Sequence, residues 1–145
     1  MERGILNNNP GNIRRSATKW HGLKKVQFDK VFCQFETMAY GIRAFFVLMK
    51  TYRYKYGLKT PREIIKRYAP ASENNVPAYL LFLEYKGLVL DNELRDDSMY
   101  CVFAKYVFLY ESRYSISVSS LHAVMQSMDC YVVNKRKECY ELNLY

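Results

Sequence analysis

The chain has 145 residues and a formal net charge of +8, and half of its residues are hydrophobic. A chain of roughly 150 residues buries about 70% of the surface that its unfolded form exposes, so one domain with a real core is expected. The high hydrophobic and aromatic content excludes an intrinsically disordered protein. The longest strictly apolar run, Ala44 to Met49, is far shorter than the ~20 residues that span a membrane, and the first residues lack the apolar core of a secretion signal.

Positive charge is concentrated in the first half of the chain. Residues 1–70 contain 15 Lys or Arg against 4 Asp or Glu, whereas residues 71–145 contain 7 against 10. A cationic half attracts polyanions of any kind, so nucleic acid, anionic glycan and membrane surfaces are candidate partners; a solvated basic face without a partner is the alternative. No recognised nucleic-acid-binding motif is present, so nucleic acid is the weakest of these candidates.

The cysteines offer no metal site. They stand at positions 33, 101, 130 and 139 without a CxxC pair, and the chain has two histidines. A zinc site needs a cluster of such ligands. We therefore predict reduced, mostly buried thiols, with a Cys130–Cys139 bridge as the alternative, and neither a metal nor a cofactor.

The most unusual stretch is RGILNNNPGNIR, from Arg3 to Arg14. It has no helical or strand periodicity, contains a Pro-Gly turn, and is crowded with side-chain amides that can each donate and accept hydrogen bonds. Such a segment either binds a partner through its amides or forms a solvated N-terminal turn.

Residues 12–36 are predicted to form a small antiparallel β region. Turn residues lie at Pro10-Gly11 and Trp20-His21-Gly22, and VQFDKVFCQFE largely alternates apolar and polar side chains. Asp29 and Lys30 lie at the expected tip of the hairpin.

A central helix is predicted to follow this region. Helical periodicity begins after Thr37, a suitable N-cap, and continues to Gly57, which suits the position after a helix. Thr60 to Glu63 is a capping box with proline at the first helical position, and Ala69-Pro70 ends the short helix that it opens.

The second half is also predicted to be helical, with short joins. The segment SENN, at residues 72–75, precedes a helix that Gly87 can close. Asp96, Asp97 and Ser98 cap a further helix with a broad apolar stripe, and this helix carries Glu111 at its C-terminal end. Another helix is predicted over roughly Val118 to Met128.

These segments together resemble a family of phage and prophage proteins, many of them virion structural proteins. The resemblance rests on RGILNNNPGNIR, Trp20 with Gly22, FCQFET, YGIRA, LMKTYRYKYGLKT, IIKRYAPASENN and Tyr79, in this order. Members are regarded as lysozyme-like, and the NNNPGNI…W.G…F..F block is similar to a block of bacterial cell-wall glucosaminidases. Those enzymes carry a catalytic glutamate upstream of the block, where this chain has only Glu2.

The resemblance implies a different place for the acid. Family members carry near their C-terminal end a helix that finishes in a His-Glu-Asn-Gly-like sequence, and this chain has LYESRYS at Leu109 to Ser115. Because this ending resembles that of a lysozyme-fold catalytic helix, we predict an α+β, mostly helical, lysozyme-like domain in circularly permuted order. A single domain would cover 1–145, with a loop and β region at 1–36, a helical part at 37–128 and a C-terminal hairpin or tail at 129–145.

The implied chemistry is cleavage of peptidoglycan glycan strands with Glu111 as general acid. A glycosidic bond needs a carboxyl group kept protonated near neutral pH, which apolar neighbours achieve. A hydrolase also wants a second carboxylate, for which Asp29 and Glu36 are the candidates. A lytic transglycosylase manages with one acid and base because the sugar's own 6-hydroxyl replaces water, and the sequence leaves both types open.

Substrate binding is assigned to amide, aromatic and carboxylate side chains that precede Glu111 in the sequence, and each has a structural alternative. The amides would bind N-acetyl groups or hold the loop, the aromatic rings would stack on sugars or belong to the core, and Glu73 would contact substrate or cap a helix. The predicted binding residues are Asn7, Asn8, Asn9, Asn12, Trp20, Tyr40, Glu73 and Asn74.

Two classes of function follow. The first is a peptidoglycan-cleaving enzyme whose basic half is attracted to the anionic wall, and the second is a noncatalytic virion or glycan-binding protein with other virion proteins as partners. We expect a protein made in the bacterial cytoplasm without a signal peptide that acts in the periplasm or cell wall, or as a virion component. The two classes differ in whether Glu111 faces a cleft lined by the asparagine-rich loop.

Overall fold

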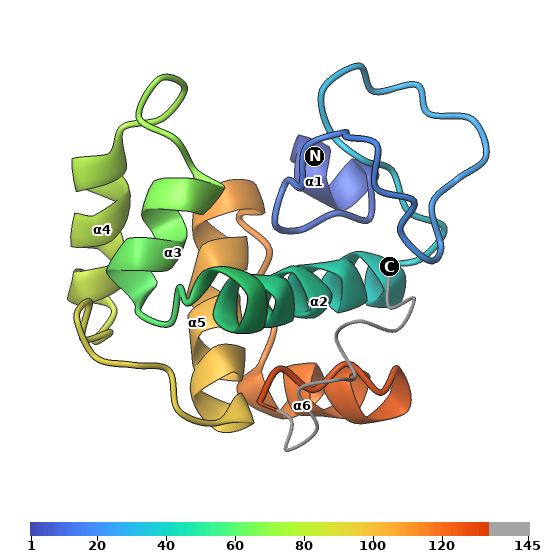
Figure 1. Cartoon of the computed structure of the whole chain (residues 1–145). Coiled ribbons are helices and arrows are strands. Elements are labelled where there is room, and N and C mark those ends of the chain that lie inside the picture. Colours follow the sequence, from blue (N-terminus) through green and yellow to red (C-terminus); the bar gives the residue numbers. More distant parts are fainter. Residues whose placement is uncertain (134–145) are drawn as a thin grey trace.

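Helices make up the regular structure of residues 1–133, which are the residues that the computed structural model describes. They are α1 (Arg3–Leu6), α2 (Met38–Tyr56), α3 (Pro61–Tyr68), α4 (Val76–Tyr85), α5 (Asp97–Ser112) and α6 (Val118–Ser127). The long segment between α1 and α2 has no regular secondary structure and lies beside the N-terminus at one end of the molecule (Figure 1).

The predicted α+β class is wrong, because no β-strand forms within the described residues. Residues 12–36 contain two isolated antiparallel bridges, Arg14 with Phe32 and Leu23 with Phe35. A ladder does not extend from them because side-chain amides take backbone groups that a neighbouring strand would use. The Gln34 amide oxygen, for example, accepts hydrogen bonds from the backbone N–H groups of Phe28 and Asp29 at 2.6 and 3.2 Å.

The start of the chain also differs from its prediction. Arg3–Leu6 forms a single helical turn where we predicted no regular structure. One turn contributes little periodicity to a sequence, and the asparagines that follow it favour turns rather than helices.

The predicted helix boundaries are confirmed where capping residues mark them. The Thr37 hydroxyl accepts a hydrogen bond from the N–H of Tyr40, and Gly57 ends α2 in the left-handed conformation at φ 67°. Thr60 caps α3, with its hydroxyl 2.8 Å from the Glu63 carboxylate. Asp96 caps α5 through the N–H of Met99 at 2.9 Å.

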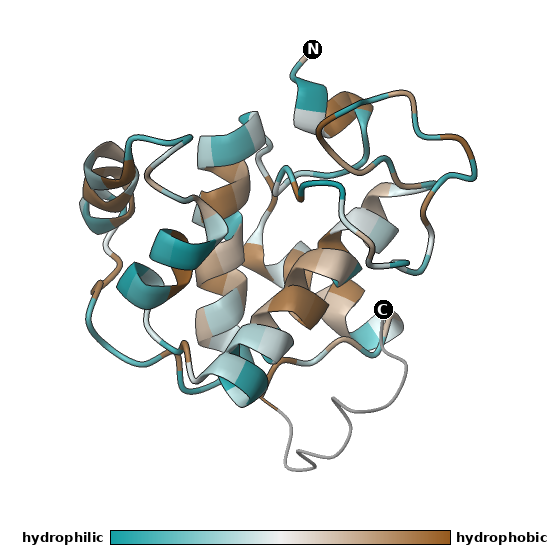
Figure 2. Ribbon diagram, turned by 45° about the horizontal axis from the view of Figure 1, so that its top comes forward, coloured by the Kyte–Doolittle hydropathy of each residue, from teal (hydrophilic) through white to brown (hydrophobic). Residues whose placement is uncertain are grey.

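The core forms around α2, which crosses the middle of the helical part (Figure 1). Its apolar face is buried, with Phe45 and Phe46 fully inaccessible. Phe45 makes edge-to-face contacts with Phe108 of α5 and Tyr68 of α3, at ring-centroid distances of 5.0 and 5.6 Å. Figure 2 shows the hydrophobic residues, in brown, gathered along these central helices. This aromatic cluster therefore holds α2, α3 and α5 together.

The remaining sequence predictions concern membrane spans and cysteines. No helix among residues 1–133 is long and apolar enough to cross a membrane. Cys33, Cys101 and Cys130 are buried thiols, and burial raises the pKa of the Cys101 thiol to about 12. Cys139 and most of the predicted C-terminal hairpin or tail lie outside the described residues.

Candidate functional site

The asparagine-rich segment is held by its own side chains. Asn9 is fully buried, and its amide nitrogen donates to the carbonyls of Ile13 and Cys33 at 3.0 and 2.9 Å. Asn8 donates to the carbonyls of Phe35 and Glu36. These amides bind backbone groups of residues 33–36 and so hold the turn against the following segment.

Asp29 is the other centre of this hydrogen-bond network. The Arg3 guanidinium contacts both of its carboxylate oxygens at 2.6 Å, and the Asn7 amide donates to it at 2.9 Å. The N–H groups of Val31 and Phe32 also donate to Asp29. The Arg3 hydrogen bonds, the largest cause, keep the pKa of Asp29 well below its ordinary value. This carboxylate is therefore ionised and occupied by protein donors.

The asparagine-rich segment packs closely against α2 and against the end of α5. A Cβ atom added to Gly4 would lie 1.8 Å from Oγ of Ser112, and one added to Gly41 would lie 1.8 Å from the carbonyl oxygen of Asn8. The buried Ser112 hydroxyl donates to the carbonyl of Pro10 at 2.8 Å. Glycine is required at these two positions because any side chain would separate the loop from α2 and α5.

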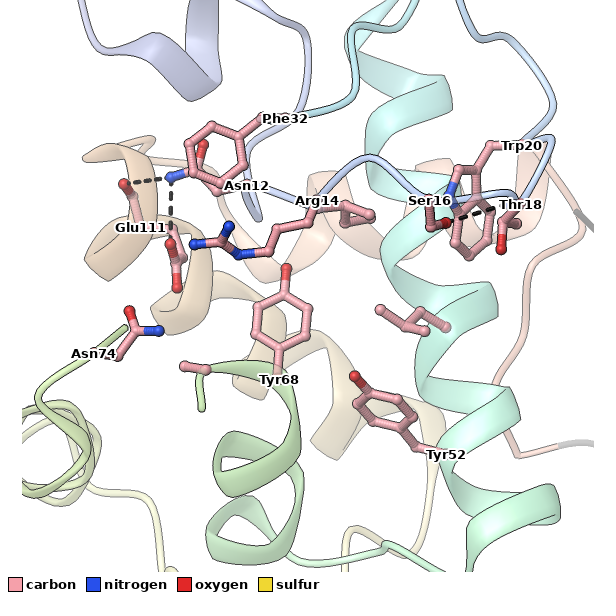
Figure 3. A pocket seen from close by; sticks show the side chains of 13 residues that line it. Asn12, Arg14, Ser16, Thr18, Trp20, Phe32, Tyr52, Tyr68, Asn74 and Glu111 are labelled. Atoms are coloured by element: carbon pink, nitrogen blue, oxygen red, sulfur yellow. Dashed lines mark hydrogen bonds between the residues drawn. The ribbon is translucent and has the colours of Figure 1, made fainter. Parts of the chain in front are cut away.

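A cleft of about 240 Å³ opens between the asparagine-rich segment and the helices. Its lining comes from the segment after the Pro-Gly turn, from α2, from the end of α3 and the loop after it, and from the end of α5. The lining residues are Asn12, Ile13, Arg14, Ser16, Thr18, Trp20, Phe32, Leu48, Tyr52, Tyr68, Ala69, Asn74 and Glu111. Figure 3 shows Asn12, Arg14, Asn74 and Glu111 at one end and Ser16, Thr18 and Trp20 at the other.

Glu111 is the one carboxylate among these lining residues. The Tyr79 hydroxyl donates to its Oε2 at 2.9 Å, and the Asn12 amide lies 3.2 Å from its Oε1 and 3.0 Å from its backbone oxygen. Burial, the largest cause, raises the pKa of Glu111 above its ordinary value, although the Tyr79 and Asn12 hydrogen bonds and the charge of Arg14 oppose the shift. The carboxyl group thus keeps its proton to a higher pH than an exposed glutamate.

Arg14 carries the positive charge nearest to Glu111 in the cleft. Its guanidinium points toward Glu111 in Figure 3, and it forms an ion pair with Glu73 at 3.0 Å. Both side chains of this pair are about half exposed. Because Glu73 balances part of the charge of Arg14, Arg14 lowers the pKa of Glu111 less than an unpaired arginine would.

The structure separates the predicted site residues into two groups. Asn12, Trp20, Asn74 and Glu111 line the cleft, and Glu73 contacts it through Arg14. Asn7, Asn8, Asn9, Asp29, Glu36 and Tyr40 are not among the lining residues. Glu36 is exposed, and the Tyr40 ring lies against Gly22.

Several residues of the site, Arg14 among them, were not predicted from the sequence. Tyr79 contacts Glu111, Tyr68 forms part of the cleft wall and donates to the carbonyl of Gly11, and Ser112 anchors the asparagine-rich segment. Both tyrosines lie in the segments that carry the family resemblance, Tyr68 within IIKRYAPASENN and Tyr79 by itself, but the resemblance assigned neither of them a role beside Glu111.

Metal ligands do not gather in the described residues. No group of three or more His, Cys, Asp or Glu side chains within residues 1–133 has the arrangement that a metal ion needs. The lining of the cleft itself presents a carboxyl group, amides, hydroxyls and a guanidinium group.

Sequence comparison relates the chain to a bacteriophage protein. It is similar to Protein P5 of Pseudoalteromonas phage PM2, with 37% identity over 101 residues. The aligned region covers 68% of this chain and 63% of P5, so it spans less than two thirds of the phage protein. No protein-family model matches the chain.

Proposed function

We propose that this chain cleaves the glycan strands of peptidoglycan as a lytic transglycosylase, with Glu111 as acid and then base. The observation that carries the proposal is a half-buried carboxyl group of raised pKa that lines a cleft beside an asparagine amide. Such a group is protonated when an ordinary glutamate is ionised, which general acid catalysis requires.

The absence of another carboxylate from the lining supports the transglycosylase type over the hydrolase. A retaining glycosidase has two carboxyl groups about 5–5.5 Å apart, and an inverting one has them about 6.5–9.5 Å apart. Asp29 is engaged by Arg3 and Asn7, and Glu36 is exposed outside the cleft. The proposal assigns neither of them a chemical step.

The proposed reaction needs only Glu111 as proton carrier. The protonated carboxyl group donates its proton to the glycosidic oxygen while the bond from that oxygen to the sugar C1 breaks. The 6-hydroxyl of the same sugar then bonds to C1, and its proton passes to the Glu111 carboxylate, which restores the starting state. The products are a free sugar end and a 1,6-anhydro end, and no water is consumed.

Contacts around the cleft support the binding of a sugar. A volume of about 240 Å³ is below the roughly 300–1,000 Å³ usual for small-molecule sites, so it suits one ring of a longer chain. The amide of Asn74 and the hydroxyls of Ser16 and Thr18 can hydrogen-bond an N-acetylated sugar, while the Asn12 amide nitrogen already donates to Glu111. Arg14 adds a cation for the carboxyl groups of the wall.

The relation to a phage protein supports the choice of substrate. A phage must pass the host wall, and the proposed activity would open it; we propose a virion-associated role on this ground. The Glu-Ser pair at residues 111–112 also resembles the ending of catalytic helices in lysozyme-type enzymes.

The test is release of soluble muropeptides from purified peptidoglycan by the wild type and by Glu111→Gln. Glutamine keeps the shape of the side chain and its acceptor oxygen, so the fold should persist. We expect 1,6-anhydro products from the wild type and a loss of at least about hundredfold in the variant, as for removal of a general acid.

Asp29→Asn serves as the matched carboxylate control and should retain cleavage if it remains folded. Products with reducing ends and no anhydro sugars would indicate a hydrolase instead of a transglycosylase. A wild type that binds peptidoglycan without releasing fragments, or equal rates in wild type and Glu111→Gln, would overturn the enzymatic proposal in favour of the noncatalytic class.

A further inference from the structure

The loop of residues 24–31 exposes apolar side chains that are not among the residues lining the cleft. Phe28 is 81% exposed and Val26 is 59% exposed. In Figure 1 the chain between α1 and α2 extends outward from the helices, so this loop lies at the periphery of the molecule. Large apolar groups in such a position cost little in a monomer but are available to a partner.

Internal hydrogen bonds hold the loop in this shape. The Gln27 amide donates to the carbonyls of Lys24 and Gln34 at 2.9 and 2.8 Å, and its oxygen accepts from the Gln34 N–H at 2.7 Å. The Gln34 oxygen accepts from the Phe28 N–H at 2.6 Å. Phe28 is thus presented outward by a loop that is already ordered, which removes part of the entropic cost of binding.

The charge of the loop is positive. Residues 24–31 contain three lysines, Lys24, Lys25 and Lys30, against Asp29 as the one acidic residue. Arg3 balances the charge of Asp29 through two contacts of 2.6 Å. Lys25 and Lys30 are exposed on either side of Phe28 in the chain.

We propose that residues 24–31 bind the surface of an anionic lipid membrane, with Phe28 and Val26 in the interface and the lysines on lipid headgroups. Peripheral binding depends on buried apolar area plus attraction to anionic lipid, and the loop supplies both. A glycan is a poorer fit here because the amides of Gln27 and Gln34 are engaged within the loop. The inference is independent of the activity proposed for Glu111.

Vesicle flotation tests this inference with the whole chain. The protein should float with vesicles of equimolar phosphatidylglycerol and phosphatidylcholine and stay behind with pure phosphatidylcholine. Phe28→Ser should lower partitioning by about tenfold, as for loss of about half of the transfer free energy of a buried aromatic side chain. Each of Lys25→Gln and Lys30→Gln should lower it by about fivefold.

Two matched controls separate the loop from general stickiness. Tyr85→Ser removes a side chain that is 84% exposed on α4, and Lys86→Gln removes an exposed charge next to it. Both should float like the wild type. In Phe28→Trp, an emission blue shift on adding anionic vesicles should report entry of the ring into the interface.

Other results would overturn the membrane assignment. Equal flotation of Phe28→Ser and the wild type would mean that the ring does not contact lipid. Failure to float, with Phe28-dependent binding to another protein, would assign the patch to that partner instead. Glu111→Gln should float normally, so a failure of wall cleavage and a failure of membrane binding are recorded separately.

Discussion

The asparagine-rich segment contacts a carboxylate at each end, and the two are held in opposite ways. At one end Asn7 and Arg3 contact Asp29, whose pKa is well below its ordinary value. At the other end Asn12 contacts Glu111, whose pKa is raised by burial. A paired cation makes the first a structural anchor, whereas burial with neutral donors leaves the second able to carry a proton.

Asn9 lies between these two ends, and its fully buried amide should contribute most to stability. Asn9→Ala should lower the free energy of unfolding by about 3 kcal/mol, because buried backbone groups of Ile13 and Cys33 lose their partners. Urea unfolding followed by fluorescence of Trp20, the single tryptophan, measures it. Asn75→Ala, at the exposed N-cap of α4, should cost only about 1 kcal/mol. Equal losses of stability in the two variants would show that the buried amide of Asn9 contributes no more than an exposed helix cap.

The two carboxylates should respond to pH with opposite signs. Asp29 has a lowered pKa, so its contribution is present above its ordinary value of 3.8 and is lost as pH falls through the folded value. Asp29→Asn should therefore be less stable than the wild type, by about 2 kcal/mol at pH 7, with a smaller difference in acid.

Glu111 should show the reverse trend. Its raised pKa means that the protonated form is favoured by folding below the ordinary value of 4.5, and this advantage is lost as pH rises through the folded value. Glu111→Gln should gain stability relative to the wild type between acid and neutral pH. Denaturation of both variants and the wild type from pH 3 to 7 measures these two opposite trends. If the stability differences of the two variants change with pH in the same direction, the two carboxylates are not held in opposite ways.

Asn12 should influence the chemistry more than the fold. Its hydrogen bond lowers the pKa of Glu111, so Asn12→Ala should move the alkaline limb of the cleavage profile to higher pH. We expect about tenfold slower cleavage and about 1 kcal/mol less stability, since one partly exposed amide is lost. Asn8→Ala is the control for the loop itself. An unchanged pH profile would show that Asn12 does not act on Glu111.

The smallest effect is expected at the ion pair of Arg14 and Glu73. Both side chains are about half exposed, so Glu73→Gln should change stability by less than about 0.5 kcal/mol. The uncompensated Arg14 charge should nevertheless move the cleavage profile slightly to lower pH, and added salt should abolish the shift. A shift that persists at high salt would have another cause.

Helix boundaries were predictable because local chemistry determines them. Thr37, Gly57, Thr60 and Asp96 act through hydrogen bonds or backbone conformations within a few residues of themselves. The predicted β region failed for a nonlocal reason. Alternation favoured strands, but Gln34 and Asn9 take backbone partners across the segment, so the pairing stops at single bridges.

The sequence by itself therefore determined the helices from α2 to α6, the central position of α2, the basic character of the first half and the unusual amide content of residues 3–14. It also singled out Glu111 as a candidate. Tertiary structure decided which amides hold the loop and which one contacts that carboxylate, because Asn12 and Glu111 are 99 positions apart. Burial, Tyr79 and Arg14 then determine the protonation of Glu111, and all three depend on how distant segments pack.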